Sequence, residues 1–493
     1  MWDDFENIEL PPGPDKKSRS VWWVLLSLVL IVALLGSSAL GLFWLWQQHQ
    51  VETAQLQRSP ATAESRASII TDEIEDEVDV VEATAVSTAV TTVSTPSGPI
   101  QNRIVFVDQN GQIGTVSPAG DELRILTNRD KRYSFPAWSP DGSQIAAVGI
   151  NRASATINVL VDDEDGETAV VYDSSEEPPF YLYWSPDSQK ISFLASHPDD
   201  PMALHLVDAD GEAESHIIST GGPFYWIWSQ NSMEMLVHIG ITGEDARLAF
   251  VGIDGDDVGD DLAVPGFFQT PGISADGRFL AYAEEVGLSG SRIVIADQQA
   301  GRQFQERHGG VVAMGWSPAN NKLAYISSAD DEGNGFYGPL RLVDAETNEI
   351  TVLSRQEVLA FFWSPNGRYL AYIRPSGKQA NANAKRQNVT RRLFAIEPAQ
   401  QFQLPHFDVV VVDTETGNGQ VLLRQAQLSF EFLTQFLPFF DQYALSHRIW
   451  SPAGDALVLP LIVDNQEQIS VVSINSGRVQ FLAEGSIGFW SWQ

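Results

Sequence analysis

Short apolar runs separated by polar turns make up most of the chain from residue 101 onward. In AWSPDGSQIAAVGI, one apolar run ends at Trp138, and Ser-Pro-Asp-Gly connects it to the next run. Proline presets φ at the second position of a turn, aspartate hydrogen-bonds its own backbone, and glycine adopts a positive φ. Runs of this length between such turns predict antiparallel strands, and the turn residues need no catalytic explanation.

The same turn returns at regular intervals along the chain. Its first residues are Trp138, Trp184, Trp228, Ile273, Trp316, Trp363 and Trp450. The first six lie 43 to 47 residues apart, and this period is typical of the four-stranded blades of a β-propeller. The last interval is 87 residues. Because it contains only one complete set of strands, we interpret it as one blade with insertions.

Acidic hairpins connect the third and fourth strands of these units. They read VDDEDGE at 161–167, VDADGE at 207–212, VDAETNE at 343–349 and VDTETGN at 412–418. Aspartate and glycine are the residues that tight antiparallel connections require. The same interpretation covers the most acidic loop, GIDGDDVGDD at 252–261, where calcium binding remains an alternative.

The two ends of the repeat region complement each other. Residues 103–127 contain three strands but no initial Trp strand, and the chain closes with SIGFWSWQ, in which Trp490 takes the position of the repeat tryptophan. We therefore expect both ends to complete one blade together, which removes two exposed sheet edges. Seven complete units and this composite predict eight blades. Seven remain the alternative, if the last strand packs against the seventh unit instead.

The repeat, WSPDG followed by an apolar strand and a VDADG hairpin, resembles the TolB-type propeller repeat, also called WD40-like or PD40. The resemblance covers residues 101–493 and is specific for architecture rather than for activity. It implies either a TolB-like protein that works through protein contacts or a propeller that gates a hydrolase domain, as in prolyl oligopeptidases. No Gly-x-Ser-x-Gly nucleophile elbow occurs, which favours the first. The chain departs from TolB in its expected anchor and blade number, and in lacking a separate α/β domain.

An uncharged apolar stretch precedes the repeats. It runs from Val21 to Trp46, which is 26 residues. A helix of that length reaches roughly 39 Å and crosses a hydrocarbon core of about 30 Å. We predict a transmembrane helix over 21–46, with a cleaved signal peptide as the alternative, although such a peptide has a shorter apolar region of about 7–15 residues.

Charges on either side of this helix predict its orientation. Lys16, Lys17 and Arg19 precede it directly, whereas the nearest basic residues after it are distant. This bias predicts a short cytoplasmic tail over 1–20 and an extracytoplasmic propeller. Residues 47–100 are acidic, rich in Ser and Thr and poor in aromatic residues, so we expect a flexible stalk.

Composition removes several classes of function. With 64 acidic and 30 basic residues the net charge is -34, which argues against nucleic-acid binding. The chain has no cysteine, which excludes disulfides, thiolate metal sites and a cysteine nucleophile. Phosphate-binding glycine motifs and paired histidines are absent from the sequence, so we predict neither a cofactor nor a metal.

The first of two insertions in the sixth repeat unit, at about 376–404, is basic in an otherwise acidic protein. Its cations are Lys378, Lys385, Arg386, Arg391 and Arg392. A solvated loop is one interpretation. The alternative is a docking segment for an acidic partner, lipid headgroups or the protein's own stalk.

The second insertion, at about 425–447, is dense in aromatic residues. The apolar spacing of LSFEFLTQFLPFFDQYALSHRI, from Leu428 to Ile449, predicts a short helix leading to Pro438, whose phenylalanines pack across a ring face or cover the channel mouth. Four polar or basic residues follow as binding-site candidates: Asp441, Tyr443, His447 and Arg448. Structural capping is the competing interpretation, because the proximity of Ser, His and Asp in sequence does not make a catalytic triad.

These patterns together predict an all-β fold: an eight-bladed β-propeller of four-stranded antiparallel sheets with N/C-terminal strand closure, preceded by one transmembrane helix. The expected function is a single-pass membrane scaffold that binds a protein or a cell-envelope component without covalent chemistry. The alternative is a peptide- or glycan-acting enzyme, or an enzyme subunit, that uses Asp441 and His447 in the propeller channel.

Overall fold

The computed structural model describes most of the repeat region, namely residues 102–163, 168–240, 246–266, 270–286, 290–328, 338–376 and 404–493. The predicted cytoplasmic tail, membrane helix and stalk lie outside the described residues, as does most of the first insertion, including Lys385, Arg386, Arg391 and Arg392. Across the described ranges, no helix is both long and apolar enough to cross a membrane.

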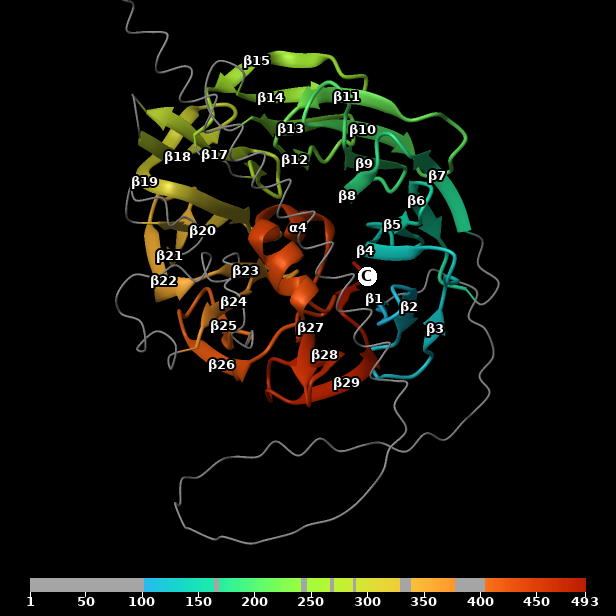
Figure 1. The fold of residues 1–493 in the computed structure, drawn as a ribbon. Helices are drawn as coiled ribbons and strands as arrows, with labels where there is room; N and C mark the ends of the chain where they lie inside the picture. Colours follow the sequence, from blue (N-terminus) through green and yellow to red (C-terminus); the bar gives the residue numbers. More distant parts are fainter. Residues whose placement is uncertain are drawn as a thin grey trace, which may run out of the picture. The chain divides into compact units, whose positions relative to one another are not determined.

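Antiparallel sheets follow one another around a ring in Figure 1. Three four-stranded sheets come first in chain order: β4 (Arg132–Trp138), β5 (Ile145–Ile150), β6 (Ala155–Leu160) and β7 (Thr168–Ser174); β8 (Pro179–Trp184), β9 (Lys190–Ala195), β10 (Met202–Asp208) and β11 (His216–Gly221); and β12 (Phe224–Trp228), β13 (Glu234–Ile239), β14 (Arg247–Gly252) and β15 (Asp257–Ala263). In each, the strand that ends in a repeat tryptophan pairs with the strand after the Ser-Pro-Asp-Gly-type turn. The predicted strand order is confirmed.

The next sheet has seven strands. It contains β16 (Gly272–Ile273), β17 (Phe279–Val286), β18 (Gly290–Asp297), β19 (Gly301–Trp316), β20 (Lys322–Ser328), β21 (Gly338–Asp344) and β22 (Ile350–Val358). Its long central strand pairs with β18 through residues 301–308 and with β20 through residues 309–316. One continuous strand therefore serves as the outer strand of one four-stranded group and the inner strand of the next.

Two further sheets come from the sixth unit and the unit after it. The first contains β23 (Ala360–Trp363), β24 (Tyr369–Pro375), β25 (Phe407–Asp413) and β26 (Gly419–Ala426), and the second contains β27 (Ala456–Val463), β28 (Gln466–Ser473) and β29 (Val479–Glu484). In the second sheet a single bridge joins Trp450 to Leu457. The segment around Trp450 thus lies beside β27 in the place of the innermost strand of this sheet, without forming a full strand.

The chain ends share one sheet, as predicted. Its order is β3 (Arg124–Ile125), β2 (Ile113–Val116), β1 (Ile104–Val107) and β30 (Ile487–Trp490). β1 and β30 pair antiparallel, and Ile104 lies opposite Trp490. Arg103 N also donates to Ser491 Oγ at 3.0 Å across this closure. A buried ion pair joins the sheet to the neighbouring unit, because Arg103 Nε lies 2.7 Å from Asp162 Oδ2 and both side chains are 2% exposed.

Hydrogen bonds within and between the recurrent turns stabilise them. In the first complete unit, the Ser139 hydroxyl donates to Asp141 Oδ1 at 2.6 Å, and Gly142 adopts φ +73°. Neighbouring turns also bond to each other, since Asp141 N donates to Ser188 Oγ at 3.1 Å. These contacts confirm the structural interpretation of the motif.

The repeat tryptophans fill the spaces between sheets. Trp184 Nε1 donates to Ala137 O of the preceding sheet at 3.0 Å. Trp363 makes the same bond to Gly315 O at 2.9 Å, and Trp450 makes it to Phe362 O at 3.0 Å. These three indoles each add apolar area and one directed hydrogen bond to the junction with the unit before them, whereas the indole nitrogens of Trp138 and Trp316 have no hydrogen-bond partner among the described residues.

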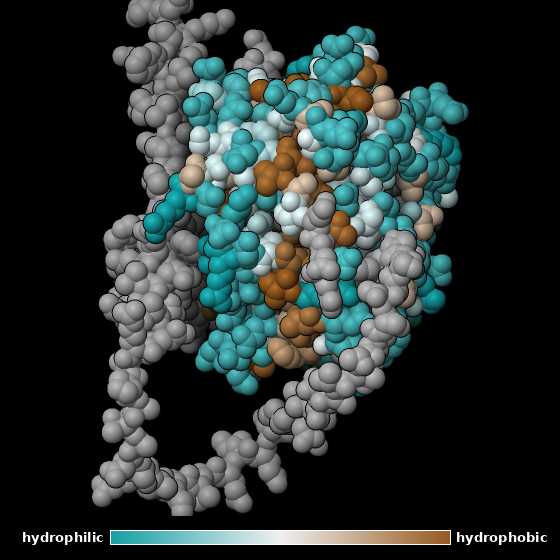
Figure 2. Space-filling view, turned by 90° about the vertical axis from the view of Figure 1, so that its right-hand side faces the viewer, coloured by the Kyte–Doolittle hydropathy of each residue, from teal (hydrophilic) through white to brown (hydrophobic). Residues whose placement is uncertain are grey.

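Apolar side chains are also exposed along the rim. Figure 2 views one part of it and shows apolar residues separated by hydrophilic ones. The exposed apolar residues of the outer strands are Ile125, Val170, Ile217, Val258, Ile350, Val352 and Phe481. Scattered single residues of this kind are ordinary on protein surfaces.

Candidate functional site

The second insertion lies at the centre of the ring (Figure 1). It follows β26 and contains a π-helical turn, η1 (Phe432–Phe436), a 3-10 turn, η2 (Leu437–Phe439), and the helix α4 (Phe440–Ser446). Phenylalanine recurs at every fourth residue from 432 to 440, a spacing that places all three rings on one side of a helical turn. The predicted helical segment leading to Pro438 is present as η1 and η2, and the α-helix α4 continues it beyond Pro438. It lies at the ring centre, whereas the sequence predicted a cover for the channel mouth or a ring face.

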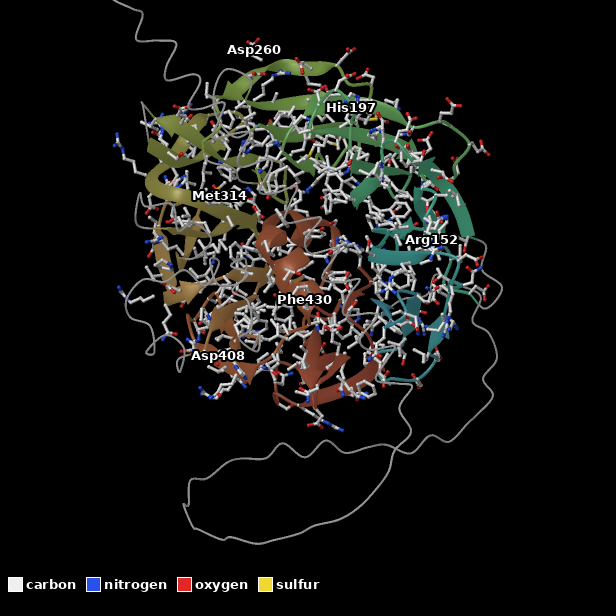
Figure 3. All side chains as sticks on the ribbon, in the orientation of Figure 1. Arg152, His197, Asp260, Met314, Asp408 and Phe430 are labelled. Atoms are coloured by element: carbon white, nitrogen blue, oxygen red, sulfur yellow. The ribbon has the colours of Figure 1, made fainter. Side chains whose placement is uncertain are left out.

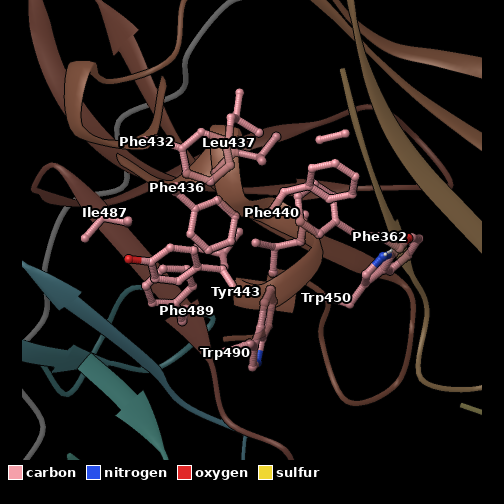
Figure 4. Packing of buried hydrophobic residues seen from close by; sticks show 14 of the residues in the cluster. Phe362, Phe432, Phe436, Leu437, Phe440, Tyr443, Trp450, Ile487, Phe489 and Trp490 are labelled. Atoms are coloured by element: carbon pink, nitrogen blue, oxygen red, sulfur yellow. Dashed lines mark hydrogen bonds between the residues drawn. The ribbon is translucent and has the colours of Figure 1, made fainter. Parts of the chain in front are cut away.

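Aromatic rings attach this segment to the inner strands (Figure 4). Phe436 stacks on Phe432 at 4.8 Å between ring centroids and lies 5.3 Å from Phe489 of β30. On another side, Phe440 meets Phe361 of β23 edge-on at 5.3 Å. Burial of so much aromatic area stabilises the insertion in place, because large apolar side chains contribute most of the packing energy of a core.

Tyr443 belongs to this core. It is 7% exposed, and its ring lies 5.0 Å from Phe135 of β4 and 4.9 Å from Tyr181 of β8. Burial raises the pKa of Tyr443 well above its ordinary value, so the phenol stays neutral. The sequence correctly singled out Tyr443 as part of this segment, but its surroundings are those of a packing residue.

Gln442, which is not among the four binding-site candidates, holds the insertion against β12. Its Oε1 accepts from Trp226 N at 2.9 Å, and its Nε2 donates to Trp226 O at 2.9 Å. Both backbone groups belong to β12, so the side-chain amide imitates a neighbouring strand. No spacing rule in the sequence signals this contact, because it depends on which inner strand the helix meets.

His447 is fixed as a neutral imidazole. Its Nε2 lies 3.2 Å from Phe135 O, and its Nδ1 lies 2.7 Å from the Ser446 hydroxyl. Because a carbonyl oxygen only accepts, Nε2 carries the proton and Nδ1 accepts from Ser446. Burial lowers the pKa of His447 to about 4, which keeps the ring uncharged near neutral pH.

Asp441 contacts the segment that precedes β16. Its Oδ2 accepts from Thr270 N at 3.2 Å, and burial raises the pKa of the carboxyl group. Beside it lies a cavity of about 30 Å³, lined also by Tyr225, Pro438 and Phe440, with room for about one water molecule. Asp441 and His447 therefore have separate partners, and the hydrogen-bonding order of a catalytic triad is not formed.

Arg448 supports the chain closure. Its guanidinium donates to Trp492 O at 2.7 Å and lies 4.9 Å from the centre of the Trp492 ring. Burial lowers the pKa of Arg448 to about 10, so the side chain remains a cation at neutral pH. The four candidates of the second insertion are thus brought into one segment, but they face different neighbours.

Acidic residues of the described chain do not assemble into a metal site. Within the described ranges, no group of three or more histidine or carboxylate side chains is arranged to hold a metal ion. In the acidic loop at 252–261, Asp257 and Asp261 both bind Arg247, with shortest distances of 3.0 and 2.6 Å. These two carboxylates serve as an ion-pair clamp across the β14–β15 hairpin.

Comparisons with known proteins give fold neighbours only. No family model matches the chain, and no curated protein matches it. Among solved structures, TolB from Acinetobacter baumannii is 17% identical with a TM-score of 0.33, over 51% of this chain and 63% of TolB. The chain therefore spans less than two thirds of TolB.

Two enzymes are among the other similar structures. Oligogalacturonate lyase in complex with manganese is 13% identical with a TM-score of 0.38, over 77% of this chain and 83% of the lyase. A prolyl endopeptidase is 14% identical with a TM-score of 0.46, over 72% of this chain and 50% of the enzyme. Since the set includes both TolB and enzymes, it does not choose between binding and catalysis.

Proposed function

We propose that this protein is a single-pass membrane protein whose extracytoplasmic propeller is a non-catalytic scaffold for another protein or a cell-envelope component. The membrane anchor and its orientation rest on the apolar stretch 21–46 and on the three cations before it. The scaffold function rests on the geometry of the ring.

The proposed propeller has eight blades. Pairing divides the seven-stranded sheet at residues 308 and 309, in the middle of β19. Counted as two blades, this sheet brings the total to eight and matches the number of sequence units. A shared strand of this kind couples two blades through its backbone.

The filled channel is the observation that carries the proposal. Ligand sites of concave folds need an open volume of about 300–1,000 Å³, whereas the cavity beside Asp441 holds about 30 Å³. The polar groups of Gln442, Ser446 and His447 are engaged with the inner strands β12, β8 and β4. The faces and rim of the ring, rather than its centre, are then the surfaces on which a partner binds.

Photo-cross-linking in intact cells tests this function. The photoreactive amino acid p-benzoylphenylalanine replaces Phe439, which is 45% exposed on the insertion, or Phe481, which is 51% exposed on β29. Phe430 lies near the ring centre in Figure 3 and is 43% exposed, so it gives a third position. The buried Tyr443 is the matched control. We expect one partner, identified by mass spectrometry and by reciprocal capture, from an exposed position but not from position 443.

An enzymatic function would give the opposite pattern. The purified full chain is offered peptide and glycoside libraries, with His447→Gln as the comparison, because glutamine can replace both imidazole hydrogen bonds. Turnover by the wild type that disappears in this variant would show that the ring centre carries chemistry, and the scaffold proposal would be abandoned.

A further inference from the structure

One junction between neighbouring sheets lacks the tryptophan that fills the others. In the unit that begins with β16, the first turn residue is Ile273, and the preceding unit reads Trp228-Ser-Gln-Asn-Ser in place of Trp-Ser-Pro-Asp-Gly. Isoleucine has neither the area of an indole nor an N–H donor. It cannot form the bond that Trp184, Trp363 and Trp450 each make to the preceding sheet.

A groove of about 360 Å³ lies at this junction. We call it the Ile273 groove. Its lining includes Gln230, Glu234, Phe250 and Val258 from the β12–β15 sheet, together with Ile273 and Gln298 from the following strands. The volume falls within the usual range of ligand sites, about 300–1,000 Å³. The groove is thus lined by the residue that stands at the repeat tryptophan position.

Fewer buried apolar residues pack together at this junction than around Trp184. Among the described residues, the separate cluster at this junction has five buried members: Leu236, Leu248, Leu280, Tyr282 and Val294. The cluster around Trp184 has thirteen. Phe250 and Ile273 are only partly buried at the edge of the smaller cluster. Apolar area that an indole covers elsewhere is therefore accessible here.

The groove is also acidic without a basic partner. No ion pair within the described ranges involves Glu234, and its one described side-chain contact is a long hydrogen bond of 3.4 Å from the Ser229 hydroxyl. In the preceding unit the equivalent position is Lys190, which pairs with Asp208. An uncompensated carboxylate beside an apolar surface favours a ligand that carries a cation next to an aromatic ring.

We propose that the Ile273 groove binds a tryptophan side chain of a partner polypeptide, with a neighbouring lysine or arginine paired to Glu234. The ligand indole takes the place of the missing repeat tryptophan, between Phe250 and Ile273. This inference rests on the proposed scaffold function and names the class of partner. The repeat itself is the model for the contact, because three other junctions show that the fold accepts an indole there.

Peptide binding to the full chain in lipid nanodiscs tests the groove. The probe is Ac-Lys-Trp-Lys-NH2, and Ac-Lys-Ala-Lys-NH2 is the comparison without the ring. Loss of a buried aromatic anchor should weaken binding on the order of tenfold. Ile273→Trp fills the groove from within and should reduce affinity for the Trp peptide by at least the same factor. Ile350→Trp, at an exposed position on β22, is the matched control and should bind like the wild type.

Two further variants keep the test decisive if Ile273→Trp fails to fold. Val258→Arg places a cation at the groove, and because Val258 is 46% exposed the fold should tolerate it. It should repel the peptide and abolish binding. Glu234→Gln should weaken binding several-fold at low salt and have little effect at high salt, because the lost interaction is a partly exposed ion pair.

Equal affinity for the Trp and Ala peptides, or unchanged binding in Ile273→Trp and Val258→Arg, would overturn the groove assignment. A different result would overturn the proposed scaffold function. If cross-linking identifies a partner at Phe439 or Phe481 while the Trp peptide does not bind, the scaffold stands and the groove proposal is wrong. If the peptide binds but cells yield no partner from Phe430, Phe439, Phe481 or a photoreactive residue at Val258 in the groove, the scaffold proposal is the one that fails.

Discussion

Two junctions of the same repeat differ in the side chain at the repeat tryptophan position. Between the β4–β7 and β8–β11 sheets, Trp184 is 2% exposed and donates to Ala137 O. Between the β12–β15 sheet and the strands that follow it, Ile273 takes that position and a groove of about 360 Å³ remains. The repeat architecture therefore tolerates the loss of an indole at one junction. The ring closes without a tryptophan at every junction. We propose that the junction without one binds the indole of a partner.

Trp184→Ala should have the largest effect on stability. Truncation of a buried tryptophan costs about 3–5 kcal/mol of unfolding free energy, whereas Ile273→Ala should cost less than about 1.5 kcal/mol because Ile273 is only partly buried. Urea unfolding of the two variants measures both. Similar losses would show that the two junctions are equally packed and would remove the contrast.

The second largest effect is a pH dependence from the filled channel. The pKa of His447 is about 4 in the folded protein and 6.5 in a model peptide. The neutral ring is therefore favoured by folding, and its contribution is present above pH 6.5 and lost as the pH falls toward 4. The wild type should lose about 3 kcal/mol more than His447→Gln between pH 7 and pH 4. Parallel curves for the two proteins would show that His447 is not buried.

A smaller loss is expected where the insertion meets β12. Gln442→Ala removes two hydrogen bonds to the Trp226 backbone and should cost about 1–3 kcal/mol, because buried backbone groups lose their partners. Gln298→Ala, in the Ile273 groove, should change the unfolding free energy by less than about 0.5 kcal/mol. A neutral Gln442→Ala would indicate that the channel segment is not seated on β12.

The smallest expected effect has the opposite sign. Ile273→Trp restores the repeat residue at the open junction and should stabilise the protein by about 0.5–2 kcal/mol, as cavity-filling substitutions commonly do. Thermal unfolding beside Ile350→Trp separates this gain from a general effect of adding an indole. Destabilisation by Ile273→Trp alone would mean that the groove cannot accept an indole from either side.

Local pattern predicted the parts of this fold that depend on neighbours in sequence. The Ser139–Asp141 turn and the hairpins follow from turn chemistry, and the pairing of Ile104 with Trp490 follows from the two incomplete ends. The continuity of β19 was not predicted, since a period counts each unit by itself. The sequence also did not predict how deeply the second insertion enters the ring. Whether an aromatic segment covers a channel or fills it depends on the channel width, which the sequence does not state.

The sequence predicted which segment contains the candidate residues, but not which neighbours their side chains contact. Asp441, Tyr443, His447 and Arg448 do cluster at the ring centre or beside it, yet their partners come from distant strands such as β4 and β8. The Ile273 groove left a visible signal, namely a repeat position without tryptophan. The structure is needed to interpret that signal, because the hydrogen bonds of Trp184, Trp363 and Trp450 show that a tryptophan at this position joins its sheet to the preceding one.

The central claim is that recognition takes place at the open junction while the ring centre is occupied by the protein itself. A photoreactive diazirine analogue of Ac-Lys-Trp-Lys-NH2, cross-linked to the full chain and mapped by mass spectrometry, tests it most directly. The account predicts labelling of the Ile273 groove at Phe250, Val258 or Gln298, with competition by the unmodified peptide. Labelling confined to residues 432–447, with the groove unmodified, would contradict it.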